Sequence, residues 1–208
     1  MTTSQRLDAI EMSQVRRRPF VDTPQAAAYR QMIETVAQFQ NALVQANPTE
    51  YQIAEMVATV TAMRQMLTEQ TVPEDQRLYG RGEIGGSNQL LVPRLTFESV
   101  DDHQLQAHTV AGHFFNGIND AMHGGVVSVV FDTVMGRLAM GTEHRVCRTA
   151  YLNTQFRNVT PIGDRLDIRA TVDVVEGRKR FISGQLWHGD TLCAEAESLF
   201  IEVKPGQQ

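Results

Sequence analysis

Hydrophobic residues in the first third of this 208-residue chain recur at the spacing of amphipathic helices. Thr23 and Pro24 provide the start of a first helix, and the break ANPTE, residues 46–50, separates it from a second. For the second helix we expect Asn47 as the cap, Pro48 in the first helical position and Glu50 completing a capping box. The two stripes consist of Tyr29, Met32, Ile33, Val36, Phe39 and Leu43, and of Ile53, Met56, Val57, Val60, Met63 and Leu67. The pattern predicts a helical hairpin over residues 21–72, packed on itself and on the rest of the protein or a neighbouring subunit.

Two segments beside this hairpin show no hydrophobic period. Residues 1–20 contain three consecutive arginines, at positions 16–18, and are predicted to form a flexible, solvated tail. Residues 80–88 read GRGEIGGSN, and this glycine content is typical of a linker. We therefore place a linker at 73–89 and a second domain at 90–204.

From residue 90 the hydrophobic period shifts toward two, which is the period of strands. The segment 90–99 contains Pro93, so we expect an edge strand or an irregular strand start there. Five further strands are predicted at 103–110, 148–156, 164–175, 180–187 and 192–203. Turn pairs such as Glu176-Gly177 and Gly189-Asp190 separate the last strands. Strands this close in sequence favour antiparallel pairing.

Residues 124–140 read GGVVSVVFDTVMGRLAM, and their local propensity conflicts with their length. The valines favour a strand, but about 17 residues is long for a strand and ordinary for a helix, and Gly141 can end it. A helix that is apolar nearly all round is one that a sheet surrounds. We therefore predict a buried helix, with Ser128 and Asp132 four residues apart on one face.

Composition narrows the class of protein. A net charge of -5 and a hydrophobic fraction of 42% give no indication of nucleic-acid or anionic membrane partners. No apolar run reaches the roughly 18 residues of a membrane span, and the N-terminus lacks the apolar stretch of a signal peptide, so we expect a cytoplasmic protein. The histidines and cysteines show no metal-ligand spacing, so no metal or cofactor is expected.

Asp132 is the residue that most needs an explanation. It stands among Val130, Phe131 and Val134, where an ionised carboxylate is costly to bury. A structural carboxylate would be capped by backbone amides or paired with Arg137 or Arg148. A functional carboxylate is the reading we favour, because acids are rarely buried without a partner or a role.

The motifs around Asp132 resemble those of hotdog-fold acyl-CoA thioesterases of the phenylacetate-degradation type and their human relatives. The matching segments are HGGVVSVVFD at 123–132, TAYLNTQF at 149–156 and TPIGD at 160–164, and the resemblance extends over residues 90–203. It implies an α+β hotdog domain, in which an antiparallel sheet of five to six strands curls around one long helix. It also implies a homodimer with sites at the subunit interface, and dimers that can pair again.

The resemblance also implies site residues. Asp132 would act as nucleophile or as general base toward water, and Thr149 would position the water. His123 would support the loop and the thioester carbonyl, although a histidine there can also simply cap the helix. Either Gly124 or Gly125 would supply a backbone donor. Many relatives have an asparagine where this chain has Gly117, and the neighbouring Asn116 is not counted as catalytic.

A second group of residues is predicted to bind the substrate. Phe114 and Phe115, with Met122, could line an acyl pocket, although a phenylalanine pair is more often part of a core. Arg178, Lys179 and Arg180 sit at a predicted hairpin tip, where they would either bind coenzyme A phosphates or form a solvated turn.

Helix geometry places a constraint on how these groups cooperate. Nine residues of α-helix span about 13 Å and about 900° of rotation, so His123 and Asp132 lie on opposite faces at different heights. If both act on one thioester, they must come from two subunits related by a two-fold axis. We therefore predict an acyl-CoA thioesterase, in which coenzyme A belongs to the substrate. The alternatives are a non-catalytic acyl-CoA or acyl-carrier binding module and a hydratase or dehydratase on the same fold.

Overall fold

The computed structural model describes residues 23–73, 76–79, 90–143 and 145–204. The predicted tail and most of the predicted linker lie outside these residues. In chain order the elements are α2 (Pro24–Gln45), α3 (Glu50–Thr68), β1 (Leu95–Val100), β2 (Gln104–Val110), the 3₁₀ helix η2 (His113–Phe115), α4 (Gly124–Met140), β3 (Cys147–Phe156), β4 (Arg165–Glu176), β5 (Lys179–His188) and β6 (Thr191–Glu202).

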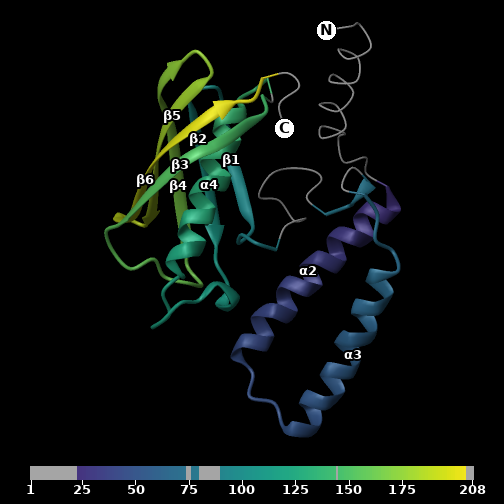
Figure 1. Ribbon diagram of the computed structural model, residues 1–208. Coiled ribbons are helices and arrows are strands. Elements are labelled where there is room, and N and C mark those ends of the chain that lie inside the picture. The colour runs from purple at the N-terminus through teal and green to yellow at the C-terminus, as the bar shows by residue number, and fades with distance from the viewer. Residues whose placement is uncertain (1–22, 74–75, 80–89, 144, 205–208) are drawn as a thin grey trace, which may run out of the picture.

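The six strands form one antiparallel sheet in the order β1-β2-β4-β5-β6-β3. Figure 1 shows this sheet curving around α4, with α2 and α3 extending beside it. The predicted α+β architecture, a sheet wrapped around one long helix with helices before it, is therefore confirmed. Pro93 precedes β1, which is an edge strand, and this also agrees with the expectation.

The helix α4 forms where local propensity favours a strand because both its length and its burial suit a helix. Its buried residues are Val127, Val130, Phe131, Val134, Met135, Leu138 and Ala139. Each large side chain buried in this way contributes about 1.5–3 kcal/mol, which exceeds the few tenths by which β-branched residues disfavour a helix.

The C-terminal end of α4 is fixed by Gly141 and Asp102. Gly141 has a φ of 61°, a left-handed conformation that suits glycine. The Asp102 carboxylate accepts hydrogen bonds from the Thr142 backbone N–H at 2.8 Å and from its hydroxyl at 3.0 Å. These hydrogen bonds hold the pKa of the Asp102 carboxyl below its ordinary value.

The start of α2 is as predicted, but the start of α3 is not. Thr23 caps α2 by accepting a hydrogen bond from the Ala26 N–H at 3.1 Å. In α3 the cap is Thr49 rather than Asn47, and Gln52 rather than Glu50 completes the capping box by accepting from the Thr49 N–H at 2.9 Å. The helix begins two residues later than expected, because the threonine and glutamine satisfy each other's backbone donors.

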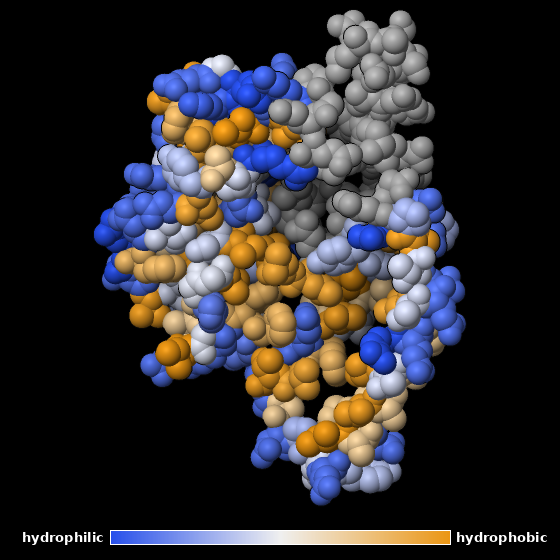
Figure 2. Space-filling view, in the orientation of Figure 1, coloured by the Kyte–Doolittle hydropathy of each residue, from blue (hydrophilic) through white to orange (hydrophobic). Residues whose placement is uncertain are grey.

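Among the described residues the predicted α2 stripe is partly buried, at Ile33 and half-buried at Tyr29, Met32 and Val36, whereas the predicted α3 stripe is not buried. In α2 only Ala26 and Ile33 are buried, and α3 has no buried residue. Large hydrophobic residues exposed on the two helices are Phe39, Leu43, Val44, Tyr51, Ile53, Val57, Val60, Met63, Met66 and Leu67. Figure 2 shows hydrophobic residues gathered on the lower part of the sheet–helix unit and continuing onto the hairpin. The physical reason is that the described part of the chain offers α3 no partner surface, so burial against a neighbouring subunit stays a prediction.

Candidate active site

Asp132 faces the edge strand β3 rather than the centre of the core. Its carboxylate oxygen Oδ1 accepts a hydrogen bond of 2.7 Å from the Thr149 hydroxyl. The side chain is half-buried, so it avoids the full cost of transferring a charge into an apolar interior. Arg137 instead donates to the Gly141 carbonyl at 3.3 Å. Within the described residues, neither Arg137 nor Arg148 forms an ion pair with Asp132.

An irregularity in β3 directs Thr149 toward Asp132. The pairing of β3 with β6 shifts between Thr149 and Tyr151, which leaves Ala150 as a bulge. Without a bulge, Thr149 and Thr154 would point to opposite faces of the sheet, because they are five residues apart. With it, both reach α4: Thr149 bonds to Asp132, and Thr154 accepts a hydrogen bond of 3.1 Å from the Ser128 hydroxyl. Bulges that re-aim a side chain are frequent beside active sites.

The backbone N–H groups at the start of α4 differ in their hydrogen bonding. His123 caps the helix, and its Nδ1 accepts a hydrogen bond of 3.0 Å from the Gly125 N–H. The His123 carbonyl accepts from the N–H groups of Val126 and Val127 at 2.8 and 3.2 Å. Among the described residues, no acceptor is bonded to the Gly124 N–H. A β-carbon at Gly124 would lie 3.1 Å from the ring of Phe156, so the position is also sterically close.

The phenylalanine pair and Met122 lie in the loop that leads to this turn. Phe114 and Phe115 form an edge-to-face pair with ring centroids 5.4 Å apart; Phe115 packs against the core, and Phe114 is 39% exposed. Met122 is buried in the core and donates its N–H to Thr160 O at 2.7 Å. Asn116 Oδ1 is buried without a hydrogen-bond partner among the described residues.

The three basic residues at the β4–β5 turn have different surroundings. Arg178 and Lys179 are exposed, whereas Arg180 is buried with its Nη1 3.3 Å from the Glu202 carboxylate. Arg178 donates to the backbone carbonyl of Glu202 at 2.7 Å, which fixes its guanidinium at the end of β6.

A cavity of about 520 Å³ brings one of these arginines together with Thr149. It is lined by Arg148, Thr149, Ala150, Arg178, Ile201, Glu202 and Val203. The Glu202 carboxylate lies 3.3 Å from Arg180 and 4.0 Å from Arg145, so its charge is compensated and the cavity remains basic. Sequence reasoning considered Arg148 only as a partner for Asp132. Because Arg148 directly precedes Thr149 on a predicted strand, the sequence could have indicated that Arg148 lies beside the site.

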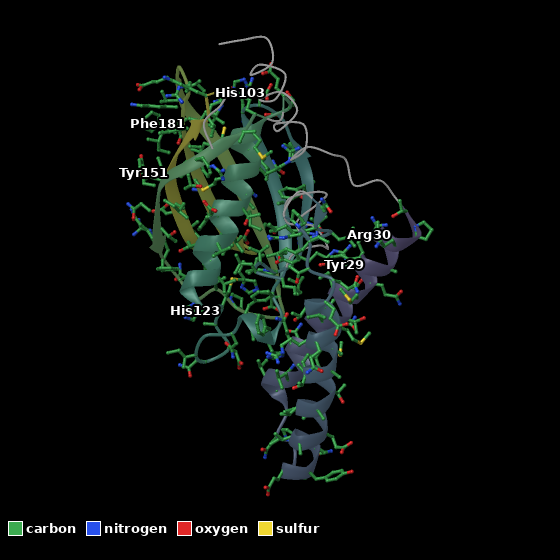
Figure 3. All side chains as sticks on the ribbon, turned by 45° about the vertical axis from the view of Figure 1, so that its right-hand side comes forward. Tyr29, Arg30, His103, His123, Tyr151 and Phe181 are labelled. Atoms are coloured by element: carbon green, nitrogen blue, oxygen red, sulfur yellow. The ribbon has the colours of Figure 1, made fainter. Side chains whose placement is uncertain are left out.

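One chain does not bring all the predicted groups together. Asp132 and Thr149 are in contact, but Gly124 is eight residues earlier on α4, which corresponds to about 12 Å along the helix. Figure 3 shows His123 at the N-terminal end of the helix, well separated from Tyr151 on β3. The site formed by a single chain is therefore a carboxylate–hydroxyl pair without the backbone donor.

Known proteins that are similar in sequence to this chain are thioesterases, as the motifs at 123–132 and 149–156 predict. Residues 119–195 match the family model of the thioesterase superfamily. The acyl-coenzyme A thioesterase THEM4 of Bos taurus is 30% identical over 111 residues, which are 52% of this chain and 45% of that protein. The THEM4 protein of Xenopus laevis is 33% identical over 96 residues, 45% of this chain and 43% of its own length. This chain thus spans less than half the length of these relatives.

Solved structures share the fold. A crystal structure of a thioesterase superfamily protein aligns with 88% of this chain and 97% of its own, with a TM-score of 0.72 and 20% identity. Zebra fish thioesterase superfamily member 2 aligns with 52% of this chain and 81% of its own, with a TM-score of 0.50 and 15% identity. These structures show the shared fold, and together with the family model and the THEM4 relatives they confirm the predicted resemblance to the hotdog thioesterases. Within the described residues, no helix is long and apolar enough to cross a membrane.

Proposed function

We propose that residues 90–204 hydrolyse the thioester of an acyl-CoA to a free acid and coenzyme A. The observation that carries the proposal is the hydrogen bond between Thr149 and Asp132, which holds one carboxylate oxygen and leaves the other without a partner among the described residues. A carboxylate held in this way beside an edge strand can react with a substrate that approaches from outside the core.

Asp132 can act in two ways, and both release the same products. As a nucleophile, its oxygen attacks the thioester carbon, the C–S bond breaks, and water hydrolyses the resulting anhydride. As a general base, it takes a proton from water while the water oxygen attacks the same carbon, and the leaving sulfur receives a proton. In both cases the carbonyl oxygen becomes negative. The Gly124 N–H, at the positive end of the helix dipole, is suited to stabilise that charge.

A second copy of the chain would supply this donor. The contacts Ser128–Thr154 and Asp132–Thr149 mean that α4 runs antiparallel to β3. If two β3 edges pair about a two-fold axis, the two α4 helices lie antiparallel as well. An axis level with Ser128 places Gly124 of one copy at the height of Asp132 of the other, because each is four residues from Ser128.

The exposed edge of β3 favours this pairing. Among the described residues β3 is hydrogen-bonded only to β6, and its other side is an unpaired edge. Tyr151 and Phe156 on this strand are 47% and 57% exposed. An exposed edge strand with aromatic side chains is a surface that another strand can cover. We therefore propose a homodimer through β3, with two composite sites.

The basic cavity beside Thr149 is suited to the phosphates of coenzyme A. Its volume of about 520 Å³ lies within the range of small-molecule pockets. Arg148 and Arg178 face this cavity, and guanidinium groups bind phosphate oxygens through paired hydrogen bonds. Because Thr149 lines this cavity and donates a hydrogen bond to Asp132, the cavity adjoins the proposed catalytic pair.

The arginine pair gives a prediction about substrate affinity. The double variant Arg148→Gln and Arg178→Gln should raise KM for an acyl-CoA about tenfold or more, since each lost charged hydrogen bond weakens binding. The same acyl group on pantetheine, which lacks the nucleotide phosphates, should show no change in KM. Arg157→Gln is the matched control, because Arg157 pairs with Glu195 outside the cavity. Equal KM effects on both substrates would contradict the assignment.

The wild-type protein itself tests the proposed activity. Purified protein mixed with short, long and aromatic acyl-CoA thioesters should release free thiol, followed with a chromogenic thiol reagent. Enzymes of ordinary efficiency turn over about 1–10³ times per second, so release is easily measured. Tight binding of acyl-CoA by calorimetry without thiol release would contradict hydrolysis and identify a binding module.

A further inference from the structure

We infer that Asn41 on α2 is a positioning residue that couples the helical hairpin to the turn presenting the Gly124 N–H. The inference rests on the proposed function and extends it to a part of the chain outside the residues that match the thioesterase family model. The hairpin would thus contribute to catalysis without touching the substrate.

The first link is a hydrogen bond between the hairpin and η2. Asn41 Oδ1 accepts from the backbone N–H of Phe114 at 2.9 Å. The same side chain lies directly over Gly112, where a β-carbon would overlap the Asn41 amide. The Gln45 side chain donates to the Asn41 carbonyl at 2.8 Å, so the residue is also tied to its own helix. Asn41 therefore fits closely against the segment 112–114.

The second link joins η2 to the start of α4. The carbonyl of Phe115, the residue after Phe114, accepts a hydrogen bond of 2.9 Å from the His123 N–H. His123 caps α4 and precedes Gly124 directly. Two hydrogen bonds and two short backbone segments, 114–115 and 123–124, thus connect α2 to the proposed oxyanion donor. A shift of η2 would move the cap and the donor with it.

An ion pair between the hairpin and the segment before β1 does not follow this route. Glu34 lies 3.8 Å from Arg94, and both side chains are more than half exposed. Arg94 precedes β1, and its carbonyl accepts a hydrogen bond of 2.8 Å from the Thr109 hydroxyl rather than from η2 or the turn. An exposed pair of this kind contributes little to stability. It therefore offers a control that removes a contact between the hairpin and the rest of the protein without touching the hydrogen bonds that lead to Gly124.

Removing the Asn41 amide should change the position of the turn before α4 more than it changes the stability of the protein. Phe114 is 39% exposed, so water can replace the lost acceptor on its N–H. Oxyanion stabilisation, in contrast, depends on donor position to within fractions of an ångström, and a displacement of about 1 Å can cost 10²-fold in rate. We expect a displacement of the Gly124 N–H by less than this distance to lower kcat about tenfold.

The test compares Asn41→Ala, Asn41→Asp and Glu34→Ala in the full chain. Asn41→Ala should lower kcat about tenfold with little change in KM, whereas Asn41→Asp, which keeps an acceptor oxygen, should restore most of it. Glu34→Ala should leave kcat unchanged. In hydrogen exchange, the amides of His123 and Val126 should exchange faster in Asn41→Ala than in Glu34→Ala. Should Asn41→Ala fail to fold, Asn41→Ser, whose oxygen reaches less far, replaces it.

Three results would overturn the inference. They are an unchanged kcat in Asn41→Ala, an equal loss in Glu34→Ala, and unchanged exchange of the His123 amide. If the wild type hydrolyses no thioester, the proposed function fails, and hydrogen exchange alone still decides whether Asn41 positions the turn.

Discussion

Replacing Asp132 with asparagine should lower kcat for acyl-CoA hydrolysis by at least about 10²-fold, with the fold and oligomeric state retained. Asparagine has nearly the same shape and keeps an oxygen that can accept the 2.7 Å hydrogen bond from Thr149. It has no negative charge, so it can neither attack the thioester carbon nor take a proton from water. The measurement is thiol release under saturating substrate, with circular dichroism and light scattering on the same sample.

Asp173 provides the matched control for this substitution. Its carboxylate accepts a hydrogen bond of 2.9 Å from the Ser183 hydroxyl, which is the same chemistry as the Asp132–Thr149 pair, but between β4 and β5. Asp173→Asn should leave kcat within about twofold of the wild type, as expected for a surface substitution. Undiminished turnover in Asp132→Asn would remove Asp132 from the mechanism. An equal loss in both variants would show that the effect is not specific to this site.

A heterodimer of two inactive variants should recover about half of the wild-type activity if the sites are composite. The variants are Asp132→Asn and Gly124→Val, whose added methyl groups would crowd Phe156 and cover the N–H of residue 124. Each homodimer has one defect in both sites, and loss of an oxyanion donor commonly costs about 10²–10³ in kcat. In the heterodimer one site combines both defects, and the other combines Asp132 of one chain with Gly124 of the other, both intact.

The experiment uses co-expression with two affinity tags, so that only heterodimers are retained before thiol release is measured. The control pairs Asp132→Asn with Thr149→Val, since Asp132 and Thr149 act from the same chain. That heterodimer should not exceed the activity of the Thr149→Val homodimer. Failure of the Asp132→Asn and Gly124→Val pair to recover activity would rule out a site shared between two chains.

The main features of the domain could be predicted from the sequence because they depend on local patterns. Strand periodicity and turn residues indicated all six strands, and length together with apolar character indicated α4. Asp132 was proposed from its place in an apolar helix, and the resemblance to the hotdog thioesterases added Thr149 as its partner. The structure adds their direct contact at 2.7 Å.

Features that depend on competition between neighbouring groups could not be read from the sequence. Asn47 and Thr49 are both good caps, and only the fit of Gln52 against Thr49 decides for the second. The bulge at Ala150 has no sequence signal, since alanine neither requires nor avoids one. The apolar stripe of α3 looks like a buried face, but nothing within the described residues covers it.

The sequence by itself thus determined the type and order of the elements and singled out Asp132, because periodicity, turns and burial cost act over a few neighbouring positions. Only the tertiary structure decided which groups meet. The bulge turns Thr149 toward Asp132, Arg148 joins Arg178 across β3 and the β4–β5 turn, and Asn41 reaches Phe114 over a separation of 73 residues. Such contacts follow from the three-dimensional packing of distant segments, and a one-dimensional pattern contains no information on their distances.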